Sequence, residues 1–466
     1  MNSGMKITFC GGARSVTGAN YHLEYKGVEM LVDCGLNQGT KYAEDLNYEP
    51  FGYDPSKIKY VFITHSHIDH IGRLPRLYRL GFRGVVYASS ATRDLIAVAL
   101  PDNMKHINRE AEESGREPLF EEDDLNGFLS LVQSVEYDEA FNLDENLKVT
   151  FHDAGHILGS TIVEINFDGA DERQKLFFTG DLGNPPTPLL KITEEVKEAD
   201  YIVIESAYGD RIHEPPEERK EKLARVMKET IGRGGVLMIP SFALERTQDL
   251  LFELHEMKKM GEVPDIPVFV DSPLAIRMTE VYKRHMRVKN DHTSEFNKTI
   301  TDLIQKDGDI FDFPGLKLTS AVEESKAIND IPAPKIIIAG SGMSQGGRIL
   351  HHELRYLSDP KNTILFVGYQ VDGSLGRRIQ RGEKQVRIFG QTVDVRCHVE
   401  TITGYSAHAD QADLLAWVKQ AARGGRLKEV FVVQGEENAA KTLANLIRDR
   451  LSIPARAPKP GEQFEV

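Results

Sequence analysis

Short apolar runs bounded by glycine, asparagine or proline recur along the first part of the chain. Such runs predict β-strands. They cover Lys6–Cys10, Tyr21–Tyr25, Val28–Asp33, Tyr60–Thr64, Val85–Ala88, Leu147–Asp153, Thr161–Phe167, Lys175–Thr179 and Tyr201–Glu205. Helical spacing of apolar positions occurs at Arg73–Leu80 and in the acidic stretch around Glu110–Leu131, with little elsewhere before residue 210. The pattern predicts a strand-rich first region with few long helices.

From Pro216 the pattern changes to an alternation of helices and strands, which is typical of a parallel α/β sheet. Predicted helices cover Glu217–Thr230, Thr247–Lys259 and Arg277–Met286, and predicted strands cover Val236–Pro240, Pro267–Asp271, Lys335–Ala339 and Thr363–Gly368. After about residue 395 come a strand, a helix over Gln411–Ala421, a strand over Val430–Val433 and a helix over Ala439–Arg450. A chain of 466 residues is expected to form two or three domains.

The composition, with 40% hydrophobic and 27% charged residues, is that of a globular protein and argues against disorder. A net charge of −14 argues against a globally basic nucleic-acid-binding protein, but not against a locally basic groove. Only Cys10, Cys34 and Cys397 are cysteines, without CxxC spacing, so we expect no disulfide framework and a cytoplasmic location. No apolar run approaches ~18 residues, so no membrane span is predicted.

The densest cluster of candidate metal ligands is the segment His65-Ser-His67-Ile-Asp69-His70. It directly follows the apolar strand Tyr60–Thr64, and a loop at a strand end is where ligand side chains can converge. Imidazole and carboxylate groups together suit zinc or a similar first-row ion. The alternative, a polar loop with solvated histidines, is disfavoured because chance rarely produces this pattern.

Other strand-end loops carry the same ligand types: His156 between Asp153 and Ser160, Asp181 before Leu182, and Asp33. Alone, each is an ordinary turn residue. Together they favour one shared site, with three histidines on one ion and the remaining ligands on another. Two ions about 3.5–4 Å apart would lower the pKa of a shared water and generate a hydroxide nucleophile. The candidate ligands are His65, His67 and His156 for the first ion, Asp69 and His70 for the second, and Asp181 as the bridging carboxylate.

A glycine-rich segment, Gly340–Gly347, follows the predicted strand Lys335–Ala339 and contains Ser341 and Gly342. Its backbone N–H groups could cradle a phosphate, although a plain tight turn is the equal alternative. Arg246 and Arg348 follow their own loops and could clamp phosphate in a bidentate manner. As ordinary surface arginines they would be unremarkable.

Residues 377–387 contain five basic side chains against one acid, Glu383. A solvated charged face is the usual meaning of such a run, whereas in an acidic protein a local basic strip is what a polyanionic substrate needs. Tyr369 and Phe242 could stack on a base, although a core position is equally expected for Phe242. The basic residues are Arg377, Arg378, Arg381, Lys384 and Arg387.

Taken together, these segments resemble the metallo-β-lactamase superfamily, whose hallmark is HxHxDH in an αββα sandwich. Within it they resemble the β-CASP nucleases, the branch of ribonuclease J and of the endonuclease subunit of the cleavage and polyadenylation specificity factor. Residues 204–211 are similar to motif A, with Glu205 as the acidic residue, and residues 404–410 to motif B, with His408 as the histidine. Residues 239–248 and 339–348 are similar to segments of the inserted β-CASP domain.

The resemblance implies an α/β fold, namely a metallo-β-lactamase αββα sandwich with an inserted parallel-sheet β-CASP domain. It implies boundaries of 1–207 for the first part of the sandwich, 208–394 for the insert and 395–466 for the completing part. It further implies a zinc-dependent ribonuclease acting on single-stranded RNA, with two zinc ions, Asp69, Glu205 and His408 as catalytic residues, and His408 as the general acid. Dimers are frequent in related proteins, so a homodimer is a further expectation.

One position departs from the pattern of the family. Motif C carries a histidine before Gly-Glu, the last ligand of the second zinc, but residues 432–437 read Val-Val-Gln-Gly-Glu-Glu, so Gln434 takes its place. A neutral amide is a poorer ligand, so the second site is expected to be weak or to prefer manganese or magnesium. Two alternatives to the ribonuclease stand: a hydrolase of small esters or thioesters, and a catalytically weakened RNA-binding member, which Gln434 alone favours.

Overall fold

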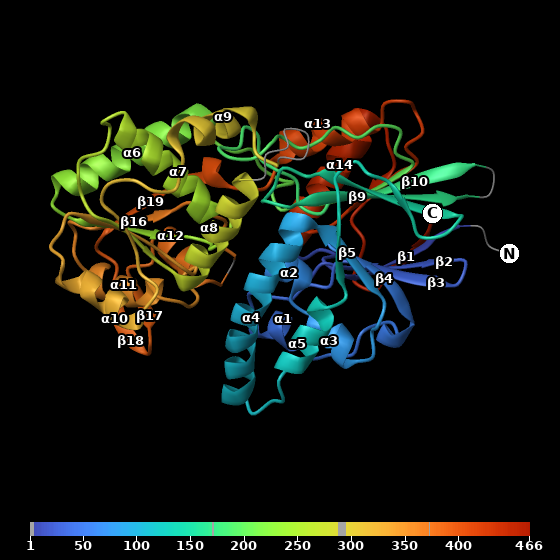
Figure 1. The fold of residues 1–466 in the computed structure, drawn as a ribbon, viewed down its shortest axis with the longest axis horizontal. Helices are drawn as coiled ribbons and strands as arrows, with labels where there is room; N and C mark the ends of the chain where they lie inside the picture. The colour runs from blue at the N-terminus through green and yellow to red at the C-terminus, as the bar shows by residue number, and fades with distance from the viewer. Residues whose placement is uncertain (1–3, 170–171, 288–294, 372) are drawn as a thin grey trace. The chain divides into compact units, whose positions relative to one another are not determined.

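The computed structural model of the protein describes residues 4–169, 172–287, 295–371 and 373–466. The chain divides into two compact units, and Figure 1 shows the elements of each. The first unit comprises Met1–Ile212, Asn290–Glu295 and His408–Val466, and the second comprises His213–Lys289 and Phe296–Ala407. The second unit is therefore an insertion in the sequence of the first. The boundaries predicted at 207/208 and 394/395 stay predictions.

The first unit contains two seven-stranded sheets. In the first sheet, β1 to β3 pair in an antiparallel manner and β3 to β6 in a parallel manner. Its order is β22 (Gln463–Glu465), β1 (Lys6–Gly11), β2 (Asn20–Tyr25), β3 (Val28–Val32), β4 (Ile58–Phe62), β5 (Val85–Ser89) and β6 (Val132–Val135). The order of the second is β21 (Ala455–Arg456), β20 (Glu429–Val432), β11 (Tyr201–Ile204), β10 (Arg173–Phe178), β9 (Thr161–Asp168), β8 (Leu147–Asp153) and β7 (Phe141–Asn142).

The main core of the first unit lies between these two sheets, because alternate side chains of each strand point inward. Phe9 and Tyr21 of the first sheet pack there against Phe178 and Phe431 of the second. A second core lies on the other face of the second sheet, under α13 (Gln411–Ala421) and α14 (Glu437–Leu451). Helix α4 (Ser90–Glu113) packs on β5 and β6 of the first sheet. This layering confirms the predicted αββα sandwich.

The sheet of the second unit confirms the predicted parallel α/β insert. All neighbouring strands in it are parallel, so their carboxyl ends share one edge. The order is β14 (Leu316–Leu318), β13 (Val268–Asp271), β15 (Lys335–Ala339), β12 (Val236–Pro240), β16 (Thr363–Phe366) and β19 (His398–Thr401). A separate hairpin is formed by β17 (Gln385–Ile388) and β18 (Gln391–Asp394). The α-helices of the second unit are α6 (Pro216–Gly232), α7 (Arg246–Lys259), α8 (Pro273–Met286), α9 (Lys298–Asp307), α10 (Val322–Ala327), α11 (Ile349–Tyr356) and α12 (Leu375–Gln380).

The helix prediction for the first region is partly wrong. Helix α4 is 24 residues long, and the residues between Glu113 and Glu122 form no helix before α5 (Glu122–Leu129) begins. The buried positions of α4 lie mostly in its first half, and Pro101 interrupts the sequence pattern, so its periodicity is weak. The remaining helices of this unit are α1 (Lys41–Asp45), α2 (Ile68–Ile71) and α3 (Leu74–Arg79).

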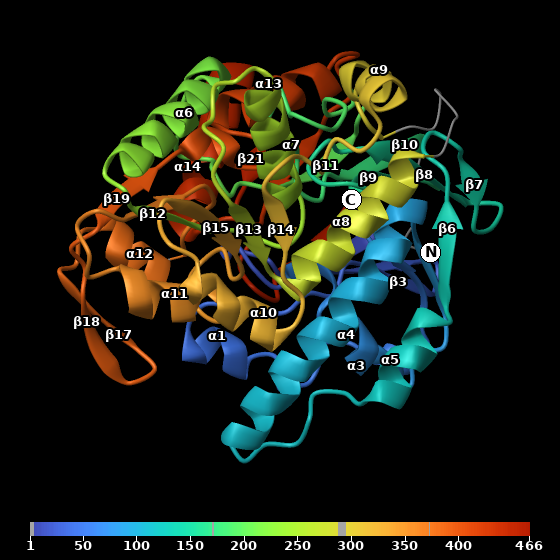
Figure 2. The same cartoon turned by 60° about the vertical axis from the view of Figure 1, so that its left-hand side comes forward.

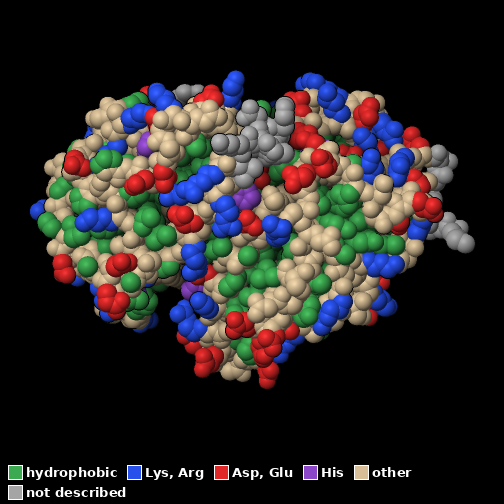
Figure 3. Space-filling view, in the orientation of Figure 1, with side chains coloured by type: hydrophobic (Ala, Val, Ile, Leu, Met, Phe, Trp, Pro, Cys, Tyr) green, Lys and Arg blue, Asp and Glu red, His purple; other side chains and the backbone are tan. Residues whose placement is uncertain are grey.

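Charged side chains of both signs are scattered over the face drawn in Figure 3, so the net charge of −14 is not gathered into one field on that face. Among the helices of the described ranges, none has the length and apolar character needed to cross a bilayer.

Candidate metal centre

The HxHxDH segment is held at the end of β4, in the loop that leads into α2. His65 is in the loop, His67 precedes the first residue of α2, and Asp69 and His70 lie within that helix. A close backbone approach fixes this turn, because Ala19 N–H donates to Asp69 C=O at 2.9 Å. A Cβ at Gly35 would lie 1.5 Å from the same carbonyl oxygen, so only glycine fits there.

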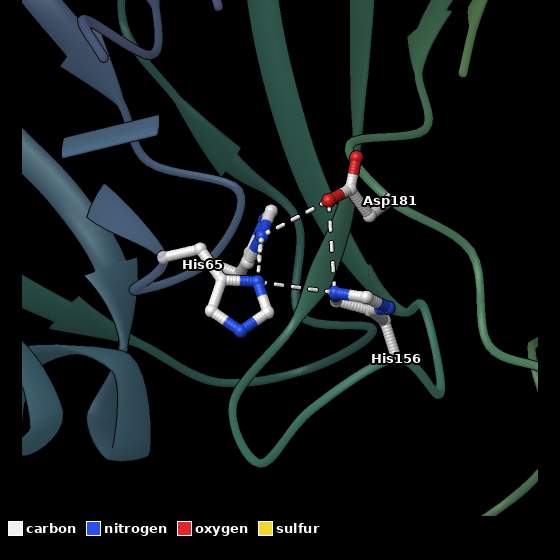
Figure 4. Close-up of side chains that lie close together, drawn as sticks. His65, His156 and Asp181 are labelled. Atoms are coloured by element: carbon white, nitrogen blue, oxygen red, sulfur yellow. Dashed lines mark hydrogen bonds and ion pairs between the residues drawn. The ribbon is translucent and has the colours of Figure 1, made fainter. Parts of the chain in front are cut away.

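The three-histidine group predicted from the sequence converges in the structure. His67 Nδ1 lies 3.1 Å from His65 Nε2 and 3.2 Å from His156 Nε2. Asp181 Oδ2 lies 3.3 Å from His65 Nε2 and 3.6 Å from His156 Nε2. Figure 4 shows the side chains of His65, His156 and Asp181 pointing toward one another. One ligand atom from each of these residues falls within 4.8 Å of all the others, which is the arrangement of a cation site.

Electrostatics keep these imidazoles in the ligand form. Burial lowers the pKa of His67 and His156 well below the ordinary value, and the neighbouring histidines lower it further. Burial and then His70 lower the pKa of His65. Neutral imidazoles carry the lone pair that a metal ion needs, so no proton has to be displaced before binding.

The loop that carries His156 is fixed by its neighbours. Ser160 Oγ accepts a hydrogen bond from His156 N–H at 3.0 Å, and Gly159 has a φ of +84°. The C=O of Gly159 accepts from Ser89 Oγ at the start of α4, and its N–H donates to the carboxylate of Glu295. Burial raises the pKa of Glu295 to about 8. Sequence patterns gave no signal for Glu295, because it comes from a distant segment and belongs to no motif.

The second predicted group surrounds His70. Asp69 Oδ2 lies 3.8 Å and Asp181 Oδ2 3.5 Å from His70 Nε2. Because Asp181 Oδ2 also faces His65 and His156, this carboxylate lies between the two groups of predicted ligands, and its bridging role stays a prediction. Asp33, noted in the sequence as a strand-end residue, contacts His70 Nδ1 at 2.8 Å, which leaves Nε2 turned toward the site.

Gln434 lies beside the second group, where its position in the segment that resembles motif C predicts it. Its Nε2 lies 3.0 Å from His70 Nε2 and 3.5 Å from Asp69 Oδ2. Its Oε1 is buried and has no hydrogen-bond partner. A cavity of about 10 Å³, lined among others by Tyr21, His70 and Gln434, adjoins this side chain. The amide therefore occupies the place of a ligand and donates toward atoms that a second cation would need.

His408 and Glu205, from motifs B and A, adjoin the same carboxylate. His408 Nδ1 lies 3.2 Å from Glu205 Oε2 and 3.8 Å from Asp181 Oδ2. Glu205 is fully buried and also accepts from Leu182 N–H at 2.7 Å. Burial alone would lower the pKa of His408, but the carboxylates of Glu205 and Asp181 outweigh it and raise the pKa to about 9. His408 is therefore protonated at neutral pH.

The residues present fit a divalent cation. Imidazole nitrogens and carboxylate oxygens are both ligands of zinc, and three imidazoles alone are a known ligand set of catalytic zinc. Asp181 Oδ1 is buried without a hydrogen-bond partner, which is costly unless a cation or water meets it. Gln434 Oε1, near the second group, is likewise buried without a hydrogen-bond partner.

The predicted phosphate-binding arginines make internal contacts in the second unit. Arg246 is buried and pairs with Asp249 at 2.7 Å. Arg348 pairs with Asp271 at 2.7 Å and donates to the C=O of Ser320. Each guanidinium would have to leave or share its carboxylate to meet a phosphate, so their role in binding stays a prediction.

Ser341 and Gly342 lie in the loop after β15, at the carboxyl edge of the parallel sheet. Ser341 N–H donates to Gly346 C=O at 3.2 Å, so part of the expected cradle bonds within the loop. A Cβ at Gly342 would lie 2.7 Å from the ring of Phe242, so glycine makes room for that half-buried ring. The carboxyl edge of a parallel sheet is where such folds commonly bind ligands.

Family models match three segments of the chain. Residues 22–176 match a metallo-β-lactamase superfamily domain, and residues 247–379 match a Beta-Casp domain. Residues 392–458 match a Zn-dependent metallo-hydrolase RNA specificity domain. The first match contains the HxHxDH segment, and the third contains His408 and Gln434.

Similar proteins extend over nearly the whole chain. "Ribonuclease TTHA0252" of Thermus thermophilus is 37% identical, over 95% of this chain and 96% of that protein. "Transcription termination factor FttA" of Methanosarcina mazei is 32% identical, over 97% of this chain and 70% of that protein. "RNase J-like protein" of Methanocaldococcus jannaschii is 28% identical, over 98% of both chains.

A crystal structure of a protein of unknown function from Enterococcus faecalis shares the fold. The TM-score is 0.53 with 12% identity, over 99% of this chain and 100% of the other. The family matches, the full-length relatives and the converging motif residues agree with one another. The chain belongs to the β-CASP branch of the metallo-β-lactamase superfamily.

Proposed function

We propose that the protein is a metal-dependent ribonuclease that hydrolyses phosphodiester bonds of single-stranded RNA. One observation carries the proposal: the group of His65, His67, His156 and Asp181 has the His408–Glu205 pair directly beside its shared carboxylate. Such a site combines cation ligands with a positioned proton donor, which phosphodiester hydrolysis requires. The relative named a ribonuclease supports RNA as the substrate.

In this mechanism the three histidines and Asp181 would hold the cation. When bound, a divalent cation would supply Lewis acidity to the phosphate and acidify a water molecule. His70 is oriented by Asp33, and Asp69 lies on the same side, so these residues supply charge and further ligands toward the second position. The protein thereby places carboxylate oxygens and imidazole nitrogens, the candidate metal ligands, close to one another.

His408 supplies the proton in this scheme. Glu205 contacts Nδ1 and holds the ring, so we assign proton transfer to the leaving oxygen to Nε2, the other ring nitrogen. Because the pKa of His408 is raised to about 9, the imidazolium is available at neutral pH. Asp69 and Glu205 complete the catalytic set proposed from the sequence.

We propose zinc at the three-histidine position and weaker binding at the second position. A second ion would have Asp69, His70, the shared Asp181 and an amide in place of the usual histidine. Coordination rich in carboxylate oxygen favours manganese or magnesium over zinc. The second position is therefore expected to exchange its ion readily.

The second unit is proposed to hold the RNA. Its carboxyl-edge loops carry Ser341 and Gly342 after β15, while Arg246 is the first residue of α7 and Arg348 precedes α11, and these remain the proposed phosphate contacts. We keep 1–207, 208–394 and 395–466 as the proposed domains. A cytoplasmic location agrees with the three free cysteines, and a homodimer remains a proposal from the resemblance.

The test is incubation of the purified protein with 5′-end-labelled RNA, with and without added zinc or manganese. Ladders of short products would reveal endonucleolytic cleavage, and mononucleotides from the labelled end would reveal 5′→3′ exonucleolytic cleavage. A small ester and a thioester serve as rival substrates in the same assay. Turnover of these esters without cleavage of RNA would contradict the proposal and favour the rival hydrolase.

A further inference from the structure

The hairpin β17–β18 exposes one face and buries the other. Val386, Ile388 and Val393 belong to the core of the second unit, while Arg387, paired with Thr392 across the hairpin, faces solvent. Figures 1 and 2 both show the hairpin beside α11. Packing of the buried face explains why the hairpin folds. It does not explain why aromatic and basic side chains occupy the exposed face.

Phe389, at the tip of the hairpin, is the residue least explained by folding. Its side chain is 54% exposed, and its φ of +48° lies in the left-handed region. A bulky residue rarely adopts this conformation, for which glycine or asparagine is favoured, and an exposed ring gains little from burial. Glycine or asparagine would serve the turn better, so an aromatic ring at this position points to a ligand.

A second ring extends this surface toward the proposed phosphate loop. The rings of Phe389 and His351 have centroids 4.8 Å apart with an interplanar angle of 35°. His351 is exposed in the first turn of α11, three residues after Arg348, the residue that precedes the helix. His351, whose ring Phe389 contacts, therefore lies about one helical turn from Arg348, one of the proposed phosphate contacts.

The segment that contains the hairpin has a charge opposite to that of the whole protein. Residues 377–396 contain six arginines and lysines against Glu383 and Asp394, in a chain whose net charge is −14. Glu383 pairs with Arg378 at 2.7 Å, and Asp394 pairs with Arg396 at 2.5 Å. These two ion pairs account for both acids of the stretch. The other basic residues, which include the exposed Lys384 and Arg387, give the stretch a net positive charge. A polyanion is the ligand that this charge attracts.

We propose that Phe389, His351, Arg387 and Lys384 form a second contact surface for single-stranded RNA, outside the metal centre. Aromatic faces stack on bases of any sequence, and basic side chains follow the phosphates, which together are the means of binding a single strand. This hairpin surface rests on the proposed ribonuclease function and adds to it a preference for longer RNA. It contributes binding and no chemistry.

The test compares a long and a short single-stranded RNA with Phe389→Asn and Arg387→Ala. Asparagine suits a positive φ, so Phe389→Asn removes the ring while keeping the turn. We expect roughly a 5-fold or larger rise in KM for the long RNA, with kcat unchanged, and no change for an RNA too short to reach the hairpin. Phe389→Tyr should retain the affinity. Arg387→Ala should also lower the salt dependence of long-RNA binding by about 0.7 in the log–log slope.

Arg450→Ala is the matched control, since it removes an exposed arginine from α14 in the other unit. Equal KM values for the hairpin variants and the unmodified protein on long RNA would overturn the proposal and leave the hairpin face to a protein partner or to solvent. Absence of RNA cleavage by the unmodified protein would instead contradict the ribonuclease function. In that event, fluorescence anisotropy with the same long RNA still tests the hairpin surface, because loss of binding in Phe389→Asn would support it.

Discussion

At the scale of single residues, the metal centre depends on neutral imidazoles that face one atom of Asp181. Replacing His67 with alanine should remove one of the nitrogen ligands and with it the tightly bound ion. We expect metal content to fall from about one zinc per chain toward zero, and RNA cleavage to be lost. Metal analysis after purification measures this. His106→Ala, which removes an exposed histidine of α4, is the control and should keep the ion.

His408 should behave as a proton donor and not as a ligand. His408→Ala is expected to lower kcat by roughly 10²–10⁴-fold at unchanged metal content. Because carboxylates raise the pKa of His408 to about 9, activity should persist at neutral pH and fall as the pH rises through about 9. Glu205→Gln removes the nearest of these charges, so the fall should move to lower pH. Loss of the ion in His408→Ala would instead identify a ligand.

Gln434 sets the strength of the second metal position. Its amide Nε2 donates to Asp69 Oδ2 and contacts His70 Nε2, so an entering cation must displace it. Activity of the unmodified protein should therefore depend on added divalent metal, and Gln434→His should reduce this dependence. Parallel titrations with zinc and manganese, following metal content and cleavage, are the measurement. Two tightly held ions in the unmodified protein, unchanged in Gln434→His, would refute the idea.

The sequence predicted which residues gather but not what holds them. His65, His67, His156 and Asp181 were found because they lie in short motifs at strand ends. Glu295, which accepts from Gly159 beside the His156 loop, was missed because nothing local in its segment suggests a distant partner. Glu295 belongs to no motif, so its contact with the His156 loop depends on the fold and leaves no signal in the local sequence.

At the scale of elements, short and strongly apolar strands were predicted well, but the 24-residue helix α4 was not. Strands β12 and β15 match the predicted bounds, since buried parallel strands read as continuous apolar runs. Strand β8 also matches, because its apolar residues Leu147, Val149 and Phe151 alternate with polar ones. The second half of α4 has few buried positions, so only its packing against β5 and β6 makes the helix evident. Strand β22 is too short for a pattern and exists through its pairing with β1.

Helix α11 carries a buried carboxyl group that should make the stability of the second unit depend on pH. Burial raises the pKa of Glu353 to about 8, and Ser344 Oγ is its hydrogen-bond partner. The folded state therefore keeps a proton that the unfolded state releases above about 4.5, so stability should fall as the pH rises from about 4.5 to about 8.

Replacing Glu353 with glutamine removes this titration. The variant should match the unmodified protein near pH 5 and melt a few degrees higher near pH 9, as measured by thermal unfolding. Glu323→Gln, at an exposed position of α10, is the control and should change neither value. An equal shift of the melting temperature at both pH values would show that ionisation of Glu353 is not the cause of the shift.

At the scale of the whole molecule, every predicted metal ligand lies in the first unit. An ion that binds only the folded state stabilises the part that contains it, by about 2.7 kcal/mol when its concentration is 100 times Kd. Chelation should therefore lower the melting temperature of the first unit and leave that of the second unchanged. Calorimetry with and without a chelator measures this. A single transition that shifts as a whole would show that the two units unfold together.

The pairing of β20 with β11 has a consequence for biosynthesis. β20 lies between β11 and β21 in the second sheet, yet it is translated only after the entire second unit. On the ribosome, the edge of β11 therefore remains open while the inserted residues emerge, and an open strand edge invites pairing with other chains. His408 is also made late, so the nascent chain can gather its histidine ligands before it has its proton donor. The site is completed by residues that follow the inserted unit in the chain.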